Sequence, residues 1–464
     1  MSSLRGPRAM PILGRHGTLA SFLRDPVAHM QALYGEYGTV AAFVKGSTEW
    51  IFAAGPEAGE AVLTNLDTFL PGALPFPVPE ASALARLSFN LTTMAGEKHK
   101  QQRRTLLPVF HKRHIETYRD EMVAIVDDII SPWSLRPDEP VNVDAAMQRL
   151  SLLVASKILF GIDASDSANQ FLRMMERWME MSSSVLVSLL PFDRPGFPYR
   201  RFLNHNVRLE QAYKAMIAAK REHPPGSTDV LSLLLTMNDD GDALSDSELI
   251  GQTHILFTAG YETTAHGLSW TLFLLAQHPR VMADVLDELD AELAGAAPNV
   301  AQLRSLPVLE RAIRESLRLF PPVYMLPRTT FEPYSIGPHT LPVGSNVLFS
   351  IYVTHRMPEL FPEPLQFNPE RWTDASPSPY AYLPFSGGSR LCLGAEFALM
   401  EMKIALAMIL QRFRLTVVPG ARISRNARAT LALRHGLPML VRPQNRDFRA
   451  VPIRGNVCEM VALS

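Results

Sequence analysis

The chain has 464 residues, 47% hydrophobic and 20% charged, which is the composition of an ordinary globular protein with an ample core. A formal net charge of −1 gives no overall electrostatic basis for nucleic-acid binding. Two cysteines exclude a disulfide framework and fit a reducing compartment, and no run of 18 or more apolar residues exists to span a membrane. No repeat, low-complexity tract or linker is found, so residues 1–464 are predicted to form one domain.

The first hundred residues contain three predicted segments. Apolar residues recur at helical spacing over residues 17–36 and predict a helix. Residues 38–53 predict a β-hairpin whose turn is Lys45-Gly46-Ser47. Residues 71–95 interleave prolines with apolar side chains and predict a loop, either packed on its own core or covering a ligand.

A basic helix is predicted from Gly96. His99 and Arg103 are spaced i, i+4 and therefore share one face of it. Between residues 96 and 114 a single acid, Glu97, faces six basic residues: Lys98, Lys100, Arg103, Arg104, Lys112 and Arg113. Such a stretch is ordinarily an exposed basic helix, but in a nearly neutral chain it also fits a docking face for an acidic protein.

Residues 120–220 show a mainly helical pattern interrupted by prolines, and four methionines in 172–190 fit either a core helix or an adaptable pocket wall. Residues 223–245 are turn-rich and polar at both ends of a short predicted helix. Ser245 and Glu248 have capping-box spacing, which predicts the start of a long helix over about 246–277.

Inside that long helix lies the hexapeptide Ala259-Gly260-Tyr261-Glu262-Thr263-Thr264. Glycine, tyrosine and β-branched threonine are poor helix-interior residues, so the segment breaks a local rule. Such a break indicates function, and threonine hydroxyls can also bend a helix by bonding to the i−4 carbonyl.

A second helix carries Glu315 and Arg318 on one face and is ended by Pro321-Pro322. Taken alone, this pair is a weak signal because surface helices carry many such pairs.

The segment 385–394 surrounds Cys392 with three glycines and leads into a helical run, 395–403. A thiolate at a helix N-terminus is stabilised by unpaired backbone N–H groups and the helix dipole, and it suits a metal ligand or a nucleophile. A lone cysteine beside a turn would more often be a buried structural residue.

Segment 385–394 fills every fixed position of the haem-binding loop of the cytochrome P-450 family, which the chain resembles over roughly residues 7–440. Four other segments carry the resemblance: 96–104, 259–264, 315–322 and 367–372. The resemblance implies a mainly α fold with a smaller β-rich lobe (α+β), in which haem lies between the long helix and the helix that follows the cysteine loop. The β-rich lobe is expected from about 37–60 and 323–375 plus C-terminal hairpins, and the helical lobe from about 96–320 and 393–415.

The same resemblance assigns roles to individual residues. Cys392 is the expected thiolate ligand of the iron of haem b, where it would favour O–O cleavage, and Phe385 and Gly394 complete its loop. Ala259 and Gly260 leave room for dioxygen, Thr263 hydrogen-bonds to the activated oxygen, and Glu262 relays protons through water. The expected propionate partners are His99, Arg103, Arg328 and Arg390. The expected structural clamp is Glu315, Arg318 and Arg371. Arg390 departs from many soluble bacterial members, which have histidine there.

The resemblance also implies a substrate pocket among residues 71–95, 175–195, 252–260, 323–326 and a hairpin near 430–437. Its candidate residues are Phe76, Gln252, Leu256, Phe257, Val323, Tyr324, Met325 and Leu433. This mainly apolar lining with few polar anchors fits a terpenoid, fatty-acid or polyketide-like substrate, although each residue also fits a protein core.

The resemblance therefore predicts a monooxygenase of secondary metabolism that uses O2 as co-substrate. Its electrons would come from NAD(P)H through a separate ferredoxin and ferredoxin reductase, or a flavodoxin-type donor, docking near Lys98, Lys100, Arg104, Lys112 and Arg113. The alternatives are a haem-thiolate peroxygenase or isomerase, and a non-catalytic haem sensor. The presence of Glu262 and Thr263 argues against a peroxygenase or an isomerase.

The N-terminus has the arginine bias of a transit peptide, but residues 7–14 resemble the proline-rich start of the family domain. This favours an untargeted, soluble and cytoplasmic protein, expected to be a monomer. No interpretation is made of the tail from Gln444, which includes Cys458.

Overall fold

The computed structural model describes residues 4–9, 14–72, 76–135, 139–162, 166–222, 229–237, 244–374 and 376–463. The chain divides into two compact units. Unit 1 contains Met1–Gly72, Val126–Met147 and Thr263–Ser464, and unit 2 contains Ala73–Ile125 and Gln148–Glu262. One domain over residues 1–464 stays a prediction.

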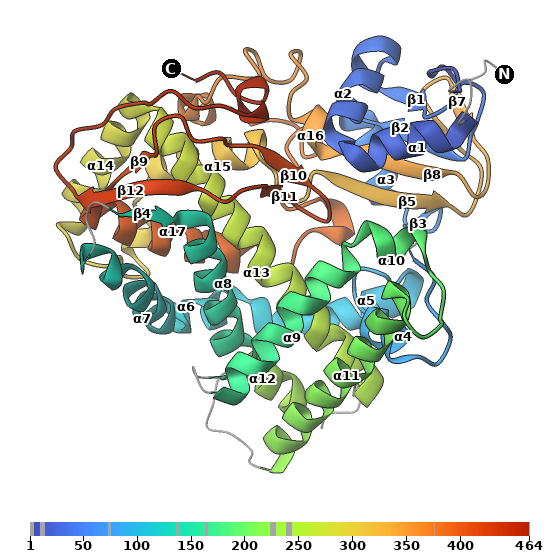
Figure 1. Ribbon diagram of the computed structural model, residues 1–464, viewed down its shortest axis with the longest axis horizontal. Helices are drawn as coiled ribbons and strands as arrows, with labels where there is room; N and C mark the ends of the chain where they lie inside the picture. Colours follow the sequence, from blue (N-terminus) through green and yellow to red (C-terminus); the bar gives the residue numbers. More distant parts are fainter. Residues whose placement is uncertain are drawn as a thin grey trace. The chain divides into compact units, whose positions relative to one another are not determined.

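Unit 1 is built on a five-stranded sheet of order β1-β2-β8-β5-β3. Its strands are β1 (Val40–Ala42), β2 (Trp50–Ala53), β3 (Phe69–Pro71), β5 (Met325–Thr330) and β8 (Asn346–Ser350). Strands β1 and β2 pair antiparallel with Val40 opposite Ala53, which confirms the predicted hairpin. Figure 1 shows the strands side by side, with α1 (Gly14–Arg24), α2 (Pro26–Tyr37) and α3 (Pro56–Thr64) next to them.

The single helix predicted over residues 17–36 is wrong in one respect, because the structure has two helices, α1 and α2. Asp25 separates them and accepts a 3.1 Å hydrogen bond from the backbone N–H of Ala28. Pro26 occupies the first helical position of α2, where its missing N–H costs no hydrogen bond.

Three smaller sheets also belong to unit 1. Strands β4 (Pro140–Asn142), β12 (Pro438–Pro443) and β9 (Phe413–Val417) form one sheet, β6 (Tyr334–Ile336) pairs with β7 (His339–Leu341), and β10 (Arg425–Ala427) pairs with β11 (Leu431–Leu433). The last pair is the predicted C-terminal hairpin, displaced a few residues toward the N-terminus.

The helical elements of unit 1, besides α1 to α3, are η2 (Ser131–Leu135), α14 (Pro279–Leu293), η4 (Gln302–Arg304), α15 (Pro307–Leu319), α16 (Ile351–Thr354), η5 (Pro369–Trp372), η6 (Gly388–Arg390), α17 (Ala395–Arg412) and η7 (Asn456–Glu459). The C-terminal tail packs on this unit: Val457 is buried, and the Ala462 N–H donates to the Leu365 carbonyl at 2.8 Å.

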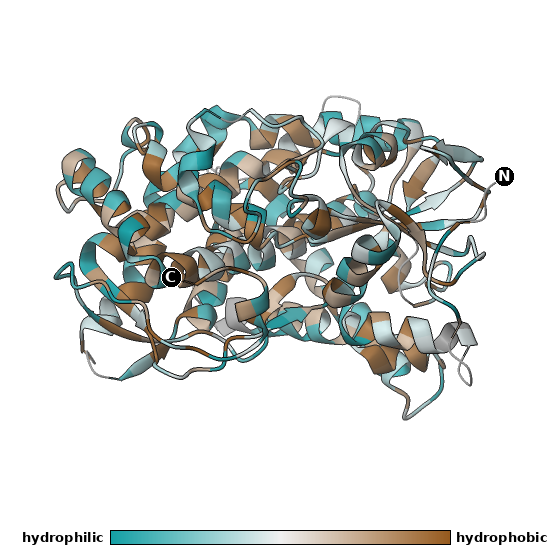
Figure 2. Ribbon diagram, turned by 90° about the horizontal axis from the view of Figure 1, so that it is seen from above, coloured by the Kyte–Doolittle hydropathy of each residue, from teal (hydrophilic) through white to brown (hydrophobic). Residues whose placement is uncertain are grey.

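Unit 2 is helical. Its own elements are α4 (Ala83–Ser88), α5 (Gly96–Leu106), η1 (Leu107–Phe110), α6 (Lys112–Thr117), α9 (Asp166–Ser182), α10 (Val185–Leu189), α11 (Pro198–Glu222) and α12 (Val230–Met237). Helices α7 (Arg119–Ile130), α8 (Val143–Phe160) and α13 (Asp246–Gln277) contain residues of both units. The prediction of a mainly α chain with a smaller β part is confirmed. Figure 2 shows hydrophobic and hydrophilic residues alternating along the helices, as expected for elements with one buried face.

Local signals predicted several of these elements. The Glu248 carboxylate accepts from the Ser245 N–H at 2.8 Å, while Ser245 Oγ accepts from the Glu248 N–H at 3.3 Å, so the capping box that starts α13 is confirmed.

The prediction of an uninterrupted loop over 71–95 is wrong, because α4 lies within it; Leu74 and Pro75 are outside the described residues. Of the predicted turn-rich segment 223–245, residues 223–228 and 238–243 are also outside them, and the short helix between is α12. Within the described ranges no helix is both long and apolar enough to cross a membrane.

Candidate functional site

Cys392 lies in unit 1, at the end of a loop that turns sharply before α17. Its backbone N–H donates to the Phe385 carbonyl at 2.9 Å, which closes the loop. Gly388 has φ +59°, and a Cβ there would lie 3.0 Å from the Leu63 carbonyl oxygen, so only glycine fits. The Cys392 side chain is exposed and forms no disulfide. Gly394, the N-cap residue of α17, provides no side-chain hydrogen bond to the first turn of that helix.

His355 fixes this loop to α15 and was missed in the sequence. Its Nε2 accepts from the Leu383 N–H at 2.8 Å, and its Nδ1 lies 3.2 Å from the Arg318 carbonyl. Burial, assisted by the positive charge of Arg318, lowers the pKa of His355 to about 3, so the ring is neutral. A neutral ring that accepts at Nε2 must carry its proton on Nδ1 and donate it to Arg318. His355 follows no spacing rule that would have singled it out.

The structure brings the predicted clamp residues together around Glu315, whose side chain is fully buried. Arg318 donates to both carboxylate oxygens at 2.9 Å, and Arg371 Nε donates to Oε1, also at 2.9 Å. Two further donors were not predicted: the Trp372 indole N–H at 3.0 Å and the Asn368 N–H at 3.1 Å. Arg318 uses its remaining hydrogens on the carbonyls of His355, Pro364 and Gln366. The carboxylate is therefore saturated with donors in a dry environment.

Arg328 and Arg390 also lie in unit 1. Arg328 is in β5 and is 8% exposed. Its Nη1 donates to its neighbour's carbonyl, that of Pro327, whereas its Nε has no hydrogen-bond partner among the described residues. Burial, together with the charge of Arg390, lowers the pKa of Arg328 to about 10. An anion would stabilise a buried guanidinium whose pKa is also lowered by the charge of Arg390, and a thiol beside a glycine-lined turn can bind a soft metal; this donor set fits a haem with its propionates.

In unit 2, α5 carries the predicted residues His99 and Arg103, of which His99 is buried and Arg103 half-buried. The basic surface is more compensated than the sequence suggested. Lys98 forms an ion pair with Glu248, and Lys100 and Arg104 both lie 3.4 Å from Glu97. Lys112 and Arg113, at the start of α6, are exposed.

The hexapeptide lies in the middle of α13, and the unit boundary falls between Glu262 and Thr263. Ala259 is exposed, and Gly260, Glu262 and Thr263 are half-buried. A Cβ at Gly260 would meet no described atom within 4 Å, so open space adjoins the helix there. By contrast, a Cβ at Gly251 would lie 2.1 Å from the Phe89 carbonyl oxygen, so that glycine is required by packing.

The predicted pocket residues differ in burial and in whether their polar groups are already hydrogen-bonded within the protein. Among those of unit 2, Leu256 is half-buried, whereas Phe76, Gln252 and Phe257 are buried. The Gln252 amide is used within the protein, accepting from the Leu91 N–H at 3.1 Å and donating to Gln102 at 2.9 Å. In unit 1, Val323 and Met325 are half-buried and Leu433 is buried, while the Tyr324 hydroxyl donates to the Arg428 carbonyl at 2.7 Å. The expected polar contacts Gln252, Thr253 and Tyr324 are therefore already engaged by protein groups, since the Thr253 hydroxyl donates to the Leu249 carbonyl at 2.6 Å.

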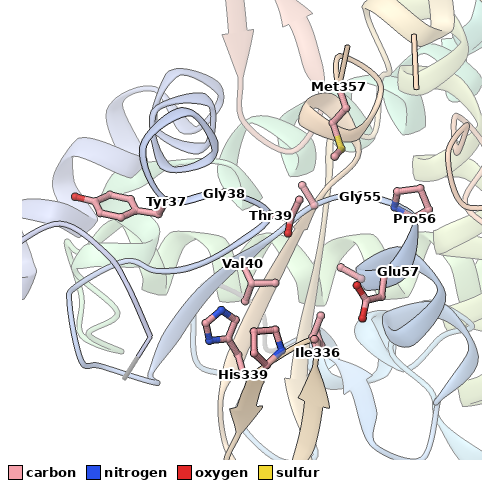
Figure 3. A pocket seen from close by; sticks show the side chains of 14 residues that line it. Tyr37, Gly38, Thr39, Val40, Gly55, Pro56, Glu57, Ile336, His339 and Met357 are labelled. Atoms are coloured by element: carbon pink, nitrogen blue, oxygen red, sulfur yellow. The ribbon is translucent and has the colours of Figure 1, made fainter. Parts of the chain in front are cut away.

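A cavity of about 380 Å³ in unit 1 lies elsewhere (Figure 3). It is lined by the start of β1, the start of α3 and the β6–β7 turn, with Thr39, Glu57 and His339 as polar side chains. None of the predicted site residues lines it, so it carries no part of the predicted chemistry.

Comparison with known proteins identifies the family. The sequence pattern of the family described as cytochrome P-450 matches residues 4–441. Cyclooctatin synthase of Streptomyces melanosporofaciens is 33% identical over 453 residues, which are 95% of either chain. Cyclooctat-9-en-7-ol 5-monooxygenase of the same organism is 34% identical over 429 residues, 89% of this chain and 90% of that one.

Solved structures give the same result for the fold. Retinoic acid bound cyanobacterial CYP120A1 superposes with a TM-score of 0.81 at 27% identity, covering 95% of this chain and 99% of the other. The cytochrome P450DA heme domain gives 0.82 at 26% identity, covering 96% and 98%. The predicted fold is thereby confirmed. The chain belongs to the cytochrome P-450 family, whose members bind haem and use dioxygen, and it is an oxidoreductase of the monooxygenase class.

Proposed function

We propose that this enzyme hydroxylates or epoxidises a terpenoid-like apolar molecule, with Cys392 as the thiolate ligand of the haem iron. The observation that carries the haem assignment is the pair Arg328 and Arg390 in the unit that holds Cys392. The Arg328 guanidinium is buried, its Nε has no hydrogen-bond partner among the described residues, and the charge of Arg390 also lowers its pKa, so a bound anion would stabilise it. The carboxylates of haem propionates are such anions. His99 and Arg103 remain proposed partners of the same groups.

Bound haem would supply the chemistry, which is activation of dioxygen with two electrons and two protons and insertion of one oxygen atom into the substrate. The chain contributes space and protons. Gly260, beside which a Cβ would meet open space, leaves room next to α13. Thr263 would hold a proton at its hydroxyl, and Glu262 would deliver protons to it through water.

The substrate class is inferred from two sources. The half-buried candidate residues Leu256, Val323 and Met325 are apolar. One relative is named for a 5-monooxygenase reaction on cyclooctat-9-en-7-ol, an unsaturated alcohol, and another for the synthesis of cyclooctatin. A cyclic, mostly hydrocarbon substrate fits both observations better than a fatty acid does, because these candidate residues offer no charged group to hold a carboxylate.

Electrons would come from NAD(P)H through a separate ferredoxin and its reductase, or a flavodoxin-type donor. The docking face is proposed around Lys112 and Arg113, with weaker contributions from Lys98, Lys100 and Arg104, which are engaged with Glu97 and Glu248. The cytoplasm stays the predicted location.

Two measurements test the proposal. The reduced, carbon-monoxide-treated protein should show the red-shifted absorbance band of thiolate-ligated haem, and Cys392→Ala should lose it, whereas Cys458→Ala should keep it. Survival of that band in Cys392→Ala would reject the ligand assignment.

Turnover of terpenoid alcohols should require NADPH, ferredoxin and reductase together. Equal turnover with hydrogen peroxide alone would instead establish a peroxygenase. Ligand-induced spectral shifts with fatty acids but with no terpenoid would reject the substrate class.

A further inference from the structure

The segment 455–462 follows the part of the chain that matches the family pattern, which ends at residue 441. It begins at Gly455, which has φ +112°, and a Cβ there would lie 2.0 Å from the Ile423 carbonyl oxygen, so the position requires glycine. Terminal segments are poorly ordered unless contacts hold them in place. Three apolar side chains of this segment are at most 1% exposed, so it is packed firmly on unit 1: Val457, Met460 and Val461.

The first polar contact of the segment is with Arg356. The Met460 carbonyl accepts from Arg356 Nη2 at 3.2 Å, and the same nitrogen donates to the Leu319 carbonyl. Arg356 is 7% exposed, its guanidinium lies 3.6 Å from the centre of the Tyr352 ring, and burial lowers its pKa to about 10. Its Nε and Nη1 have no hydrogen-bond partner among the described residues. The side-chain hydrogen bonds of this buried cation therefore go to two carbonyls, one of which belongs to the segment.

The second contact is a short backbone pairing. The Ala462 N–H donates to the Leu365 carbonyl at 2.8 Å, and Ala462 also forms a parallel β-bridge with Gln366. Leu365 lies between Pro364 and Gln366, whose carbonyls accept from Arg318 at 2.8 and 3.1 Å. The pairing therefore fixes the stretch of backbone that provides two of the acceptors of Arg318.

The two contacts converge on the clamp. The third carbonyl that accepts from Arg318, at 2.8 Å, is that of His355, and Arg356 is the residue that follows it. Segment 455–462 thus holds both stretches of backbone that provide Arg318 with carbonyl acceptors, in each case through the adjacent residue. This arrangement joins a part of the chain outside the family match to the network around Glu315.

His355 extends the connection to the cysteine loop. Its Nε2 accepts from the Leu383 N–H at 2.8 Å, and two residues later the Phe385 carbonyl accepts from the Cys392 N–H at 2.9 Å. Because Arg356 and His355 are consecutive, a displacement of the Arg356 side chain that shifts its backbone also moves the acceptor of the Leu383 N–H.

We propose that segment 455–462 positions the cysteine loop by holding Arg356 and Leu365 in place. The inference rests on the proposed role of Cys392 as the haem ligand, and it adds positioning residues that act through His355 and Arg318. A displaced loop weakens electron donation from the thiolate to iron, because the geometry and hydrogen bonding of a ligand tune its metal. Two properties of the haem-loaded protein report this: the red-shifted carbon-monoxide band, and the reduction potential, which becomes more positive when donation weakens.

The first test is Gly455→Ala, in which the added Cβ displaces the start of the segment and leaves its other side chains unchanged. We expect it to lose most of the red-shifted band and to have a more positive reduction potential than wild type, both measured well below its thermal midpoint. Gly344→Ala is the matched control, since Gly344 also has a positive φ, +81°, but a Cβ there would meet no described atom within 4 Å. It should lower the thermal midpoint and keep the wild-type band and potential.

A lower thermal midpoint of Gly455→Ala with the wild-type band and potential would overturn the inference, because the segment would then only stabilise the fold. Absence of the red-shifted band from wild type would instead reject the proposed role of Cys392, and this inference with it.

A second pair of variants tests Arg356 and decides the question if Gly455→Ala does not fold. Arg356→Met keeps an unbranched side chain but donates to neither carbonyl, so it should lose most of the band, whereas Arg356→Lys can still donate and should keep part of it. When Gly455→Ala is added to Arg356→Met, the reduction potential should shift no further, because both changes break one connection. A wild-type band in Arg356→Met, or additive shifts of the potential in the double variant, would overturn the inference.

Discussion

The polar groups around Glu315 and those along the middle of α13 follow opposite rules. Around Glu315 the carboxylate and the guanidinium of Arg318 have their hydrogen-bonding capacity taken up by protein groups. Along α13 the described residues leave capacity unused: Gly260 adjoins open space, and Nε2 of His254 has no hydrogen-bond partner among them. A saturated network is rigid and has no group to offer a ligand, whereas unsatisfied groups cost stability unless something binds to them. The contrast separates the residues that hold the fold from those that act.

The largest effect is expected at the saturated network. Glu315→Ala leaves Arg318 and Arg371 without their carboxylate in a buried site, which costs about 3–5 kcal/mol. That is a large share of the stability of a typical protein. We expect little folded, haem-loaded protein, measured as haem absorbance per chain and as the thermal midpoint.

The matched control is Glu310→Ala on the same helix. Glu310 pairs with Lys403 at 2.7 Å, but its side chain is 44% exposed, so the loss should stay below about 1 kcal/mol. Normal haem content in Glu315→Ala would show that the network is dispensable and that the contrast drawn here is wrong.

The same contrast explains what the sequence could and could not predict. Glu315, Arg318 and Arg371 were predicted because they form recognisable motifs, and the start of α13 because Ser245 and Glu248 are three residues apart. His355 and the ion pair of Lys98 with Glu248 were missed, since these contacts join residues that no spacing rule connects. The end of α1 at Asp25-Pro26 could have been predicted, because an N-cap residue followed by proline is a local signal.

The second prediction concerns Thr263. Thr263→Ala removes the hydroxyl proposed to hold a proton, so product formation should fall about 100-fold while haem binding and stability stay normal. The measurement is product formed per NADPH consumed. Thr253→Ala is the control, because that hydroxyl is bonded to the Leu249 carbonyl of its own helix. Equal losses in the two variants would mean that α13 is merely being perturbed.

Two glycines of α13 extend the comparison to packing, because an added Cβ would clash at Gly251 and would meet open space at Gly260. Gly251→Ala places a methyl group against the Phe89 carbonyl and should destabilise the protein by about 1–3 kcal/mol. Gly260→Ala meets no described atom and should be neutral or stabilising by up to about 1 kcal/mol, because alanine favours helices. Its cost should appear in turnover instead, since the methyl group occupies the proposed space for dioxygen. Urea denaturation midpoints and product rates separate the two, and a Gly260→Ala enzyme with full activity would reject the role given to Gly260.

The smallest effect is expected at the protein surface, where some basic residues are paired with acidic ones and others form no ion pair among the described residues. Lys98 is paired with Glu248, whereas Lys112 and Arg113 are exposed and form no ion pair with another described residue. Reversing Lys112 and Arg113 to Glu should slow reduction by ferredoxin several-fold at low salt and much less at high salt, because exposed charges are screened. Reversing two other exposed arginines of unit 2, Arg194 and Arg201, controls for net charge. Equal slowing by both pairs would show that overall charge, and no particular face, guides the electron donor. A selective effect of Lys112 and Arg113 would instead show that the electron donor recognises local uncompensated charge on this part of the surface.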